Sequence, residues 1–332
     1  MNTVDEILET GYIKSLTLVI FIIPFVLDAL GKTEYYFIAF IVAAFIVLLS
    51  YLDVKKRQKL YETEVLPIPI VVSIEPNVKS RYILKNLFSD LEKKTNLKDL
   101  QKNLQRYRNI TDDELIFNYN GDLYDKERII SFMQIVRYQI AKIKENTSNQ
   151  VEFHLAYHSR PAFGFFLGYI FAQEDLVVYQ QTPDKDRFDR VATLEKRDYK
   201  NEVDHYTKFR IEQEKEDPNS KEALLAIKAS SHYIKFNSPS LQNYTHIVSM
   251  VANHNGTIAD DEDWVLYARE IFTQLQTLQN SYEKVTIVHN LPESLAIIVG
   301  RATGNFWSTM ITQYDRGEYK EIMQLDDLKC YF

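Results

Sequence analysis

The chain has 332 residues, which is room for a membrane segment plus one large or two small globular domains. Its formal net charge of −7 argues against a long nucleic-acid partner, since that binding rests on a basic surface, but leaves a small anionic ligand open. Cys330 is the only cysteine, so an internal disulfide and a cysteine-built metal site are excluded. The sequence contains neither GxGxxG nor GxxxxGK[ST], and we expect no metal and no resident cofactor.

Two apolar runs open the chain. Residues 16–27 read LTLVIFIIPFVL and extend to a spannable length over 12–30, and residues 35–52 form a run of 18 without a charge. Because about 20 apolar residues cross a bilayer core, both runs are predicted to span a membrane. The loop Gly31–Glu34 is so short that the two helices must form a hairpin.

The charges around these runs predict their orientation. Asp5, Glu6 and Glu9 precede the first run, which argues against the alternative of a cleaved signal peptide. A basic collar follows the second run, formed by Lys55, Lys56, Arg57 and Lys59. The positive-inside rule then places both termini in the cytoplasm, so we expect a two-pass membrane protein with residues 1–59 as its membrane domain. Asp28 is either a snorkelling end residue or part of a polar path in an assembly.

Strands and helices alternate after the collar. Short β-branched or apolar runs predict strands over 66–74, 151–157 and 176–180, and apolar residues at helical spacing predict helices over 83–91 and 129–140. Residues 162–171 are apolar on every side and predict a buried helix. Such alternation is typical of α/β folds with parallel sheets.

The last third of the chain repeats this unit. The strands 151–157 and 176–180 correspond to 284–289 and 310–314, Pro161 to Pro292, and Gly168 to Gly300, while Phe188-x-x-Val191-x-x-Leu194 corresponds to Tyr319-x-x-Ile322-x-x-Leu325. We expect each of these glycines to let its helix approach the sheet closely. Residues 224–230 and 268–278 are looser counterparts of the first strand and of the helix 129–140, and Ile211–Glu222 has the composition of a linker. The sequence therefore predicts a tandem of two α/β units, residues 60–215 and 216–332.

Two polar turns stand at equivalent places in this repeat. The first polar turn is His158–Pro161 and the second is His289–Ser294, each between a predicted strand and a buried helix. Ligands of parallel α/β sheets bind at the carboxyl ends of strands, and free N–H groups at helix starts attract phosphate. Two such crevices suit a ligand with several phosphates and near-symmetry. The alternative is that Ser159 and Asn290 only cap helices.

The segments 153–180 and 288–325, with their strand, polar turn, proline, apolar helix, glycine and strand, resemble the SAVED domain. The resemblance covers about residues 65–332 and implies two fused CARF-like, Rossmann-like units that sense cyclic oligonucleotides in CBASS anti-phage defence. A hairpin followed directly by the sensor is similar to the TM-SAVED type of effector. The implied ligand is a cyclic trinucleotide or tetranucleotide.

The resemblance places ligand contacts by position only. In the first half they fall on Ser73, Glu75, Asn77, His158, Ser159 and Arg160, and in the second on Ser230, Ser231, His232, His289, Asn290 and Glu293. Arg160 and Lys228 are the expected phosphate partners, and His158, His232 or Tyr233 the expected stacking partners for a base. Arg160 and Glu293 differ in charge, so we expect the two crevices to contact different parts of the ligand.

Two alternatives stay open. His158 with Ser159 is compatible with a ligand-degrading enzyme, although no HExxH, GxSxG or paired-carboxylate motif supports other catalysis, and we expect no enzyme. A membrane-tethered adaptor is the other alternative, and the polar residues at both strand ends argue against it. The expected function is that ligand binding drives homo-oligomerisation, gathers the hairpins in the lipid bilayer and breaches the membrane, causing abortive infection.

Overall fold

The structure is a computed structural model that describes Asp28 and residues 36–331, apart from 75–78, 148, 183–186, 195–196, 218, 231–233, 255 and 304–307. The chain divides into two compact units. Unit 1 combines residues 1–66 with 99–109, and unit 2 combines residues 67–98 with 110–332. Each unit is described by itself.

Unit 1 is built on the helix α4 (Tyr36–Glu62), against which α6 (Leu100–Arg108) packs. Asp53 of α4 pairs with Arg106, whose Nη1 lies 3.0 Å from its Oδ1, and the guanidinium of Arg108 lies 3.7 Å from the ring centre of Tyr61. The buried guanidinium of Arg108 has a lowered pKa, mainly because burial disfavours its charged form. These contacts hold α6 on the charged half of α4.

The predicted membrane hairpin falls on unit 1. Residues 12–30 lie outside the described residues except for Asp28, and residues 36–52 form the first part of α4, with Phe37 71% and Phe45 58% exposed. Within the part of the chain that the structure describes, no helix has the length and apolar character needed to cross a membrane. The predicted span over 35–52 is therefore not supported, and α4 continues without a break into the basic collar.

Unit 2 contains two mixed sheets of equivalent strand order. The first sheet has the order β2-β1-β3-β4-β5, and the second has β11-β10-β9-β7-β8-β6. The first-sheet strands are β1 (Val65–Ser73), β2 (Ile116–Asn118), β3 (Gln150–His158), β4 (Asp175–Thr182) and β5 (Arg187–Leu194). The second-sheet strands are β6 (Phe209–Lys215), β7 (Glu222–Lys228), β8 (Ile247–Ala252), β9 (Lys284–His289), β10 (Thr309–Asp315) and β11 (Glu318–Gln324).

The pairing of the strands repeats as well. β1 with β2 and β3 with β4 are parallel and β4 with β5 is antiparallel, just as β7 with β8 and β9 with β10 are parallel and β10 with β11 is antiparallel. The predicted α/β fold with a duplicated unit is confirmed by this match. The second sheet carries one further strand, β6, which pairs antiparallel with β8 at the edge.

The prediction of a linker over Ile211–Glu222 is wrong. Residues 209–215 form β6, so the second sheet begins before the predicted boundary between residues 215 and 216. The sequence IEQEKED looked like a linker because it is so charged, but charged side chains are typical of edge strands, where they prevent pairing with other molecules. Phe209 anchors the strand, being 1% exposed.

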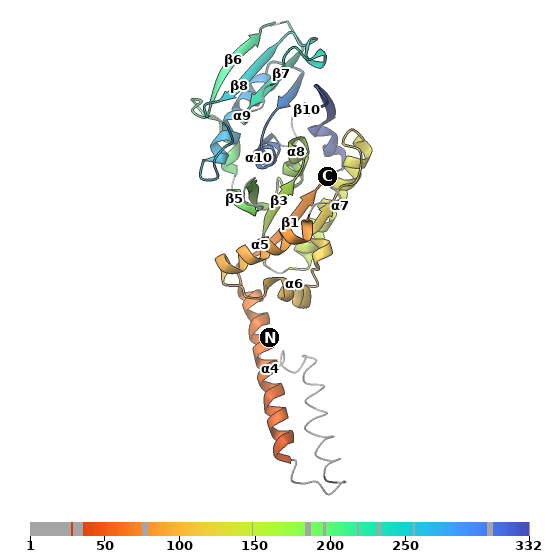
Figure 1. The fold of residues 1–332 in the computed structure, drawn as a ribbon, viewed down its shortest axis with the longest axis vertical. Helices are drawn as coiled ribbons and strands as arrows, with labels where there is room; N and C mark the ends of the chain where they lie inside the picture. The colour runs from red at the N-terminus through yellow and green to blue at the C-terminus, as the bar shows by residue number, and fades with distance from the viewer. Residues whose placement is uncertain are drawn as a thin grey trace. The chain divides into compact units, whose positions relative to one another are not determined.

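The helices of unit 2 are α5 (Ser80–Thr95), α7 (Lys126–Glu145), α8 (Pro161–Ile170), α9 (Trp264–Gln279) and α10 (Glu293–Thr303). The equivalent helices α8 and α10 lie side by side between the two sheets (Figure 1). Every residue from Ala162 to Ile170 is buried, as is every residue from Ser294 to Thr303. These two helices are therefore the centre of the core that joins the halves.

Glycines set the distance between α8 and α10. A Cβ built on Gly168 would lie 2.0 Å from the carbonyl oxygen of Ile297, and one built on Gly300 would lie 2.1 Å from that of Phe165. The prediction that these glycines bring helix and sheet together is corrected, since the backbone that they approach belongs to the equivalent helix of the other half. Arg301, 3% exposed, adds a tie by donating to the carbonyl oxygens of Phe171 and Leu194, both at 2.9 Å.

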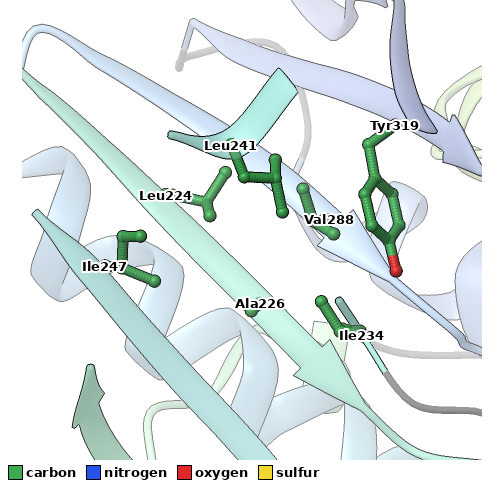
Figure 2. Close-up of a cluster of buried hydrophobic side chains, with 7 residues drawn as sticks. All are labelled: Leu224, Ala226, Ile234, Leu241, Ile247, Val288 and Tyr319. Atoms are coloured by element: carbon green, nitrogen blue, oxygen red, sulfur yellow. The ribbon is translucent and has the colours of Figure 1, made fainter. Parts of the chain in front are cut away.

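A second apolar cluster covers the second sheet. Ile234 and Leu241, from the segment after β7, pack over strand residues that include Ala226, Val288 and Tyr319 (Figure 2). The ring of Tyr319 is buried, and burial raises its pKa to about 12. This cluster fixes the segment that leaves the carboxyl end of β7 against the sheet.

Candidate functional site

The two polar turns lie at the carboxyl ends of equivalent strands, as predicted. The first follows β3 and leads into α8, and the second follows β9 and leads into α10. Because α8 and α10 pack directly against each other, the fold brings the two turns to the same end of the paired helices. We treat this end as the candidate site.

Tyr157 holds the first polar turn in place. Its buried hydroxyl donates to the carbonyl oxygen of Arg160 at 2.7 Å, and Arg160 is an extended N-cap residue whose side chain is exposed and does not cap the helix. Pro161 stands at the first helical position, where its missing N–H has no partner to lose. The turn therefore exposes a guanidinium directly before a helix start. His158 is half-buried at the end of β3.

Ser159 is strained and carries a polar atom without a partner. Its φ of 151° lies in a region that non-glycine residues rarely adopt, and its Oγ is buried without a hydrogen bond in the described part of the chain. Strain and an unsatisfied buried hydroxyl each cost free energy, and in native proteins they concentrate at functional sites. The alternative interpretation, that Ser159 only caps α8, is not supported, because its Oγ makes no capping hydrogen bond with the described residues.

Asn290 has a structural role in the second polar turn. Its Oδ1 accepts from the backbone N–H groups of Ala229 at 2.6 Å and Ser230 at 3.1 Å, while its own N–H donates to the carbonyl oxygen of Ile227 at 3.1 Å. The side chain thus ties the end of β9 to the end of β7. This arrangement matches neither the helix-cap alternative nor a side chain that points outward to a ligand.

His289 is a neutral imidazole at physiological pH. It is 7% exposed, and burial lowers its pKa to about 4, an effect that the backbone of Thr312 offsets only in part. Its ring centre lies 5.1 Å from that of Phe165 in α8, and its Nε2 makes no hydrogen bond of ordinary geometry with any described residue. His289 is therefore unsuited to neutralise a phosphate.

The start of α10 is capped from the first half. Gln180, near the end of β4, accepts from the N–H of Ser294 at 3.2 Å and donates to Oε2 of Glu293 at 3.2 Å. Ser294 in turn donates from its hydroxyl to the carbonyl oxygen of Tyr179 at 3.0 Å. Glu293 is therefore tied to a first-half side chain 113 residues away in sequence.

The remaining second-half candidates lie at the end of β7. The ammonium of Lys228 lies 3.3 Å from Oε1 of Glu214 and 4.6 Å from the ring centre of Phe236, so a phosphate would have to replace Glu214 to reach it. The backbone of Ser230 is held by Asn290. Ser231, His232 and Tyr233 lie outside the described residues.

A hollow lies beside the end of β1. Ser73 is fully buried, and its carbonyl oxygen accepts from the N–H of Tyr119 at 2.8 Å, while Glu75 and Asn77 lie outside the described residues. A cavity of about 370 Å³ is lined by Lys79, Ser80, Arg81, Tyr82, Asp113, Ile116 and Asn118, the last of which pairs with Ser73 in the sheet. Asn118 was missed by the sequence analysis, because β2 is three residues long and shows no period. It accepts from the hydroxyl of Ser80 at 3.0 Å.

Among the described residues, no group of three or more His, Cys, Asp or Glu side chains is placed to hold a metal ion. The polar groups of the candidate site are a guanidinium, hydroxyls, amides, a neutral imidazole and the carboxylate of Glu293, which Gln180 holds. Such groups are suited to bind and orient an anionic, polar ligand.

One known protein family matches part of the chain. The family model of the SAVED domain, described as "SMODS-associated and fused to various effectors sensor domain", matches residues 187–325, which run from β5 to β11. The family model thus matches the part of the predicted SAVED domain from residue 187 to residue 325. The comparison with curated proteins gives no match.

Two similar solved structures are of an Acinetobacter baumannii Cap4 SAVED/CARF-domain containing receptor. The complex with the cyclic trinucleotide 2'3'3'-cAAA has a TM-score of 0.52 and 14% identity, covering 86% of this chain and 66% of that chain. The complex with 3'3'3'-cAAA has a TM-score of 0.52 and 13% identity, covering 98% of this chain and 78% of that chain. At these identities the likeness concerns the fold, and the chain spans only part of the length of both receptors.

Proposed function

We propose that unit 2 is a sensor that binds a cyclic oligonucleotide at the shared end of α8 and α10. The observation that carries the proposal is the pair of polar turns at the ends of β3 and β9, the first of which leaves the buried Oγ of Ser159 without a hydrogen bond to any described residue. The SAVED match and the cyclic trinucleotides bound by the Cap4 receptors support this ligand class. We further propose that the chain binds its ligand without turnover, so incubation with labelled 3'3'3'-cAAA should return it intact.

Arg160 is expected to be the main phosphate partner in the first polar turn. Its exposed guanidinium makes no cap to α8, so Arg160→Ala removes charge without removing a structural contact of the helix start. A charge-assisted hydrogen bond contributes about 1.5–3 kcal/mol, which corresponds to a loss of about tenfold or more in affinity for 3'3'3'-cAAA. Calorimetric titration of the full chain measures this loss.

The matched control is Lys221→Ala. Lys221 precedes β7, at the opposite end of the strand from the candidate site, and its side chain is 77% exposed in a pair with Glu283. We expect wild-type affinity for this variant and wild-type melting for both. If Arg160→Ala binds as tightly as Lys221→Ala, the placement of the site is wrong.

We also propose that residues 1–62 carry the effector function at a bacterial inner membrane. The exposed apolar side chains of α4, among them Phe37, Phe45 and Leu48, favour contact with lipid. The N-terminal segment of a single chain is too small to enclose a pore, so the proposal requires that ligand-bound sensors assemble and gather these segments, which raises their local concentration. The consequence is a breached membrane and death of the infected cell.

Dye influx into liposomes tests this step. We expect leakage when the full chain meets 3'3'3'-cAAA, and none for a chain that lacks residues 1–52. Leakage that does not depend on the ligand would reduce the N-terminal segment to an anchor or a non-specific lipid binder.

A further inference from the structure

A hairpin of the second half lies at the start of α8. The strands β10 and β11 are joined by Arg316 and Gly317, whose φ values are 50° and 99°. Positive φ at both central residues is typical of a two-residue type I′ turn. Arg316 is exposed at its tip, and the Nζ of Lys320 lies 2.7 Å from Oδ2 of Asp315 and 5.3 Å from the ring centre of Tyr124.

Arg160 belongs to the same cluster of charges. The pKa of Asp315 is lowered, first by its hydrogen bond from Lys320 and then by the positive charges of Lys320, Arg316 and Arg160. The same Arg160 opposes the rise in the pKa of Tyr124, which burial causes in the first place. Lys320 pairs with Asp315, and β10 contacts α8, so Arg316 and Arg160 also act on this carboxylate. We call Arg160, Arg316 and Lys320 the basic cluster.

The equivalent end of α10 is built differently. There Gln180 accepts a hydrogen bond from the first turn of the helix and donates one to the carboxylate of Glu293. The start of α8 has no side-chain cap, and the buried Oγ of Ser159 beside it lacks a hydrogen-bond partner among the described residues. A phosphate can be neutralised and hydrogen-bonded at the α8 end, whereas at the α10 end it would meet a carboxylate.

We propose that the α8 end is the phosphate-binding end of the site, and that Arg316 and Lys320 of the β10–β11 hairpin complete it together with Arg160. This assignment rests on the proposed function, and it names a phosphodiester group of the cyclic oligonucleotide as the group bound there. The described residues make the site asymmetric although the fold is repeated, because Gln180 and the carboxylate of Glu293 stand at the α10 end, where the α8 end carries cations.

Four single variants of the full chain test the assignment, with 3'3'3'-cAAA as the titrated probe. Arg316→Asn removes the charge while asparagine tolerates the left-handed backbone of the turn. Lys320→Gln removes the second charge at similar length. Each is expected to weaken binding by about fivefold to tenfold. Asp315→Asn removes the competing carboxylate and is expected to tighten binding by about threefold.

The control is Lys221→Gln, an exposed charge change away from the cluster, with unchanged affinity expected. The differences among the variants should shrink as salt is added, because exposed charges are screened. If the wild type binds and Arg316→Asn, Lys320→Gln and Asp315→Asn all match it, the hairpin assignment is overturned while the sensor proposal stands. A wild type that binds no cyclic oligonucleotide overturns both.

Discussion

Replacing Gly168 by alanine is expected to lower the free energy of unfolding by about 3 kcal/mol or more. The added Cβ would lie 2.0 Å from the carbonyl oxygen of Ile297 and 2.6 Å from the backbone nitrogen of Arg301. These atoms belong to the backbone of α10 and cannot rotate away as a side chain would, so the two helices must separate. Gly300→Ala should have a similar effect, since its Cβ would lie 2.1 Å from the carbonyl oxygen of Phe165.

The direction of the change in unfolding free energy shows whether helix propensity or packing dominates. In a helix interior, replacing glycine by alanine ordinarily stabilises by about 1 kcal/mol, so a loss can come only from the packing. Gly164→Ala is the graded control, because its nearest backbone neighbour, the carbonyl oxygen of Glu293, is 2.9 Å away. Urea unfolding of the three variants should rank Gly164→Ala as the mildest. Unchanged or raised stability of Gly168→Ala would show that α8 and α10 do not pack this closely.

Glu270→Ala is expected to cost about 3 kcal/mol or more of unfolding free energy. The carboxylate of Glu270 is fully buried in α9 and accepts hydrogen bonds from the backbone N–H groups of Thr207, Lys208 and Phe209 and from the hydroxyl of Thr207. Its removal leaves these donors without a partner at the start of β6. Buried donors that lose their acceptor carry the full cost of desolvation.

Glu283→Ala is the control for this prediction. Its side chain is 71% exposed in a surface pair with Lys221, and such pairs contribute little, about 0–1 kcal/mol. Glu270→Gln should fall between the two, since an amide keeps one acceptor oxygen. Equal thermal stability of Glu270→Ala and Glu283→Ala would contradict the fixed position of β6 on the second sheet.

Much of the fold follows from the sequence because the repeat fixes it twice. Pro161 and Pro292 mark the two helix starts, and the apolar runs around them predict β3, α8 and β9 to within a residue. β2 and β6 were missed for physical reasons. β2 is too short for a periodic pattern, and β6 is exposed along most of its length, so its composition resembles that of a loop.

The sequence predicts where the candidate site lies along the chain, but not which residues contact one another there. The positions of Ser159 and Arg160 after β3 follow from local pattern, but their neighbours come from the other half of the chain. Local sequence cannot show that Gln180 caps α10, or that the hairpin with Arg316 lies beside α8. The same holds for Asn290, whose carboxamide accepts hydrogen bonds that join two strand ends and therefore has a structural role.

A near-symmetric fold with an asymmetric site has a consequence for the ligand. The α8 end carries the basic cluster, while the α10 end carries Glu293 and Gln180. A cyclic oligonucleotide bound across both ends would then place a phosphate at the first and a hydrogen-bonding edge of a base or sugar at the second. On this proposal the repeat supplies one composite site per chain, where two independent sites would each need their own cations.

The stoichiometry of binding tests this central claim most directly. Isothermal titration of the full chain with 3'3'3'-cAAA is expected to give one ligand per chain, with the linear trinucleotide of the same sequence binding more weakly because it must lose more conformational freedom. Saturation at two ligands per chain would show that each polar turn forms a site of its own, and an absence of binding to any cyclic di-, tri- or tetranucleotide would contradict the sensor function itself.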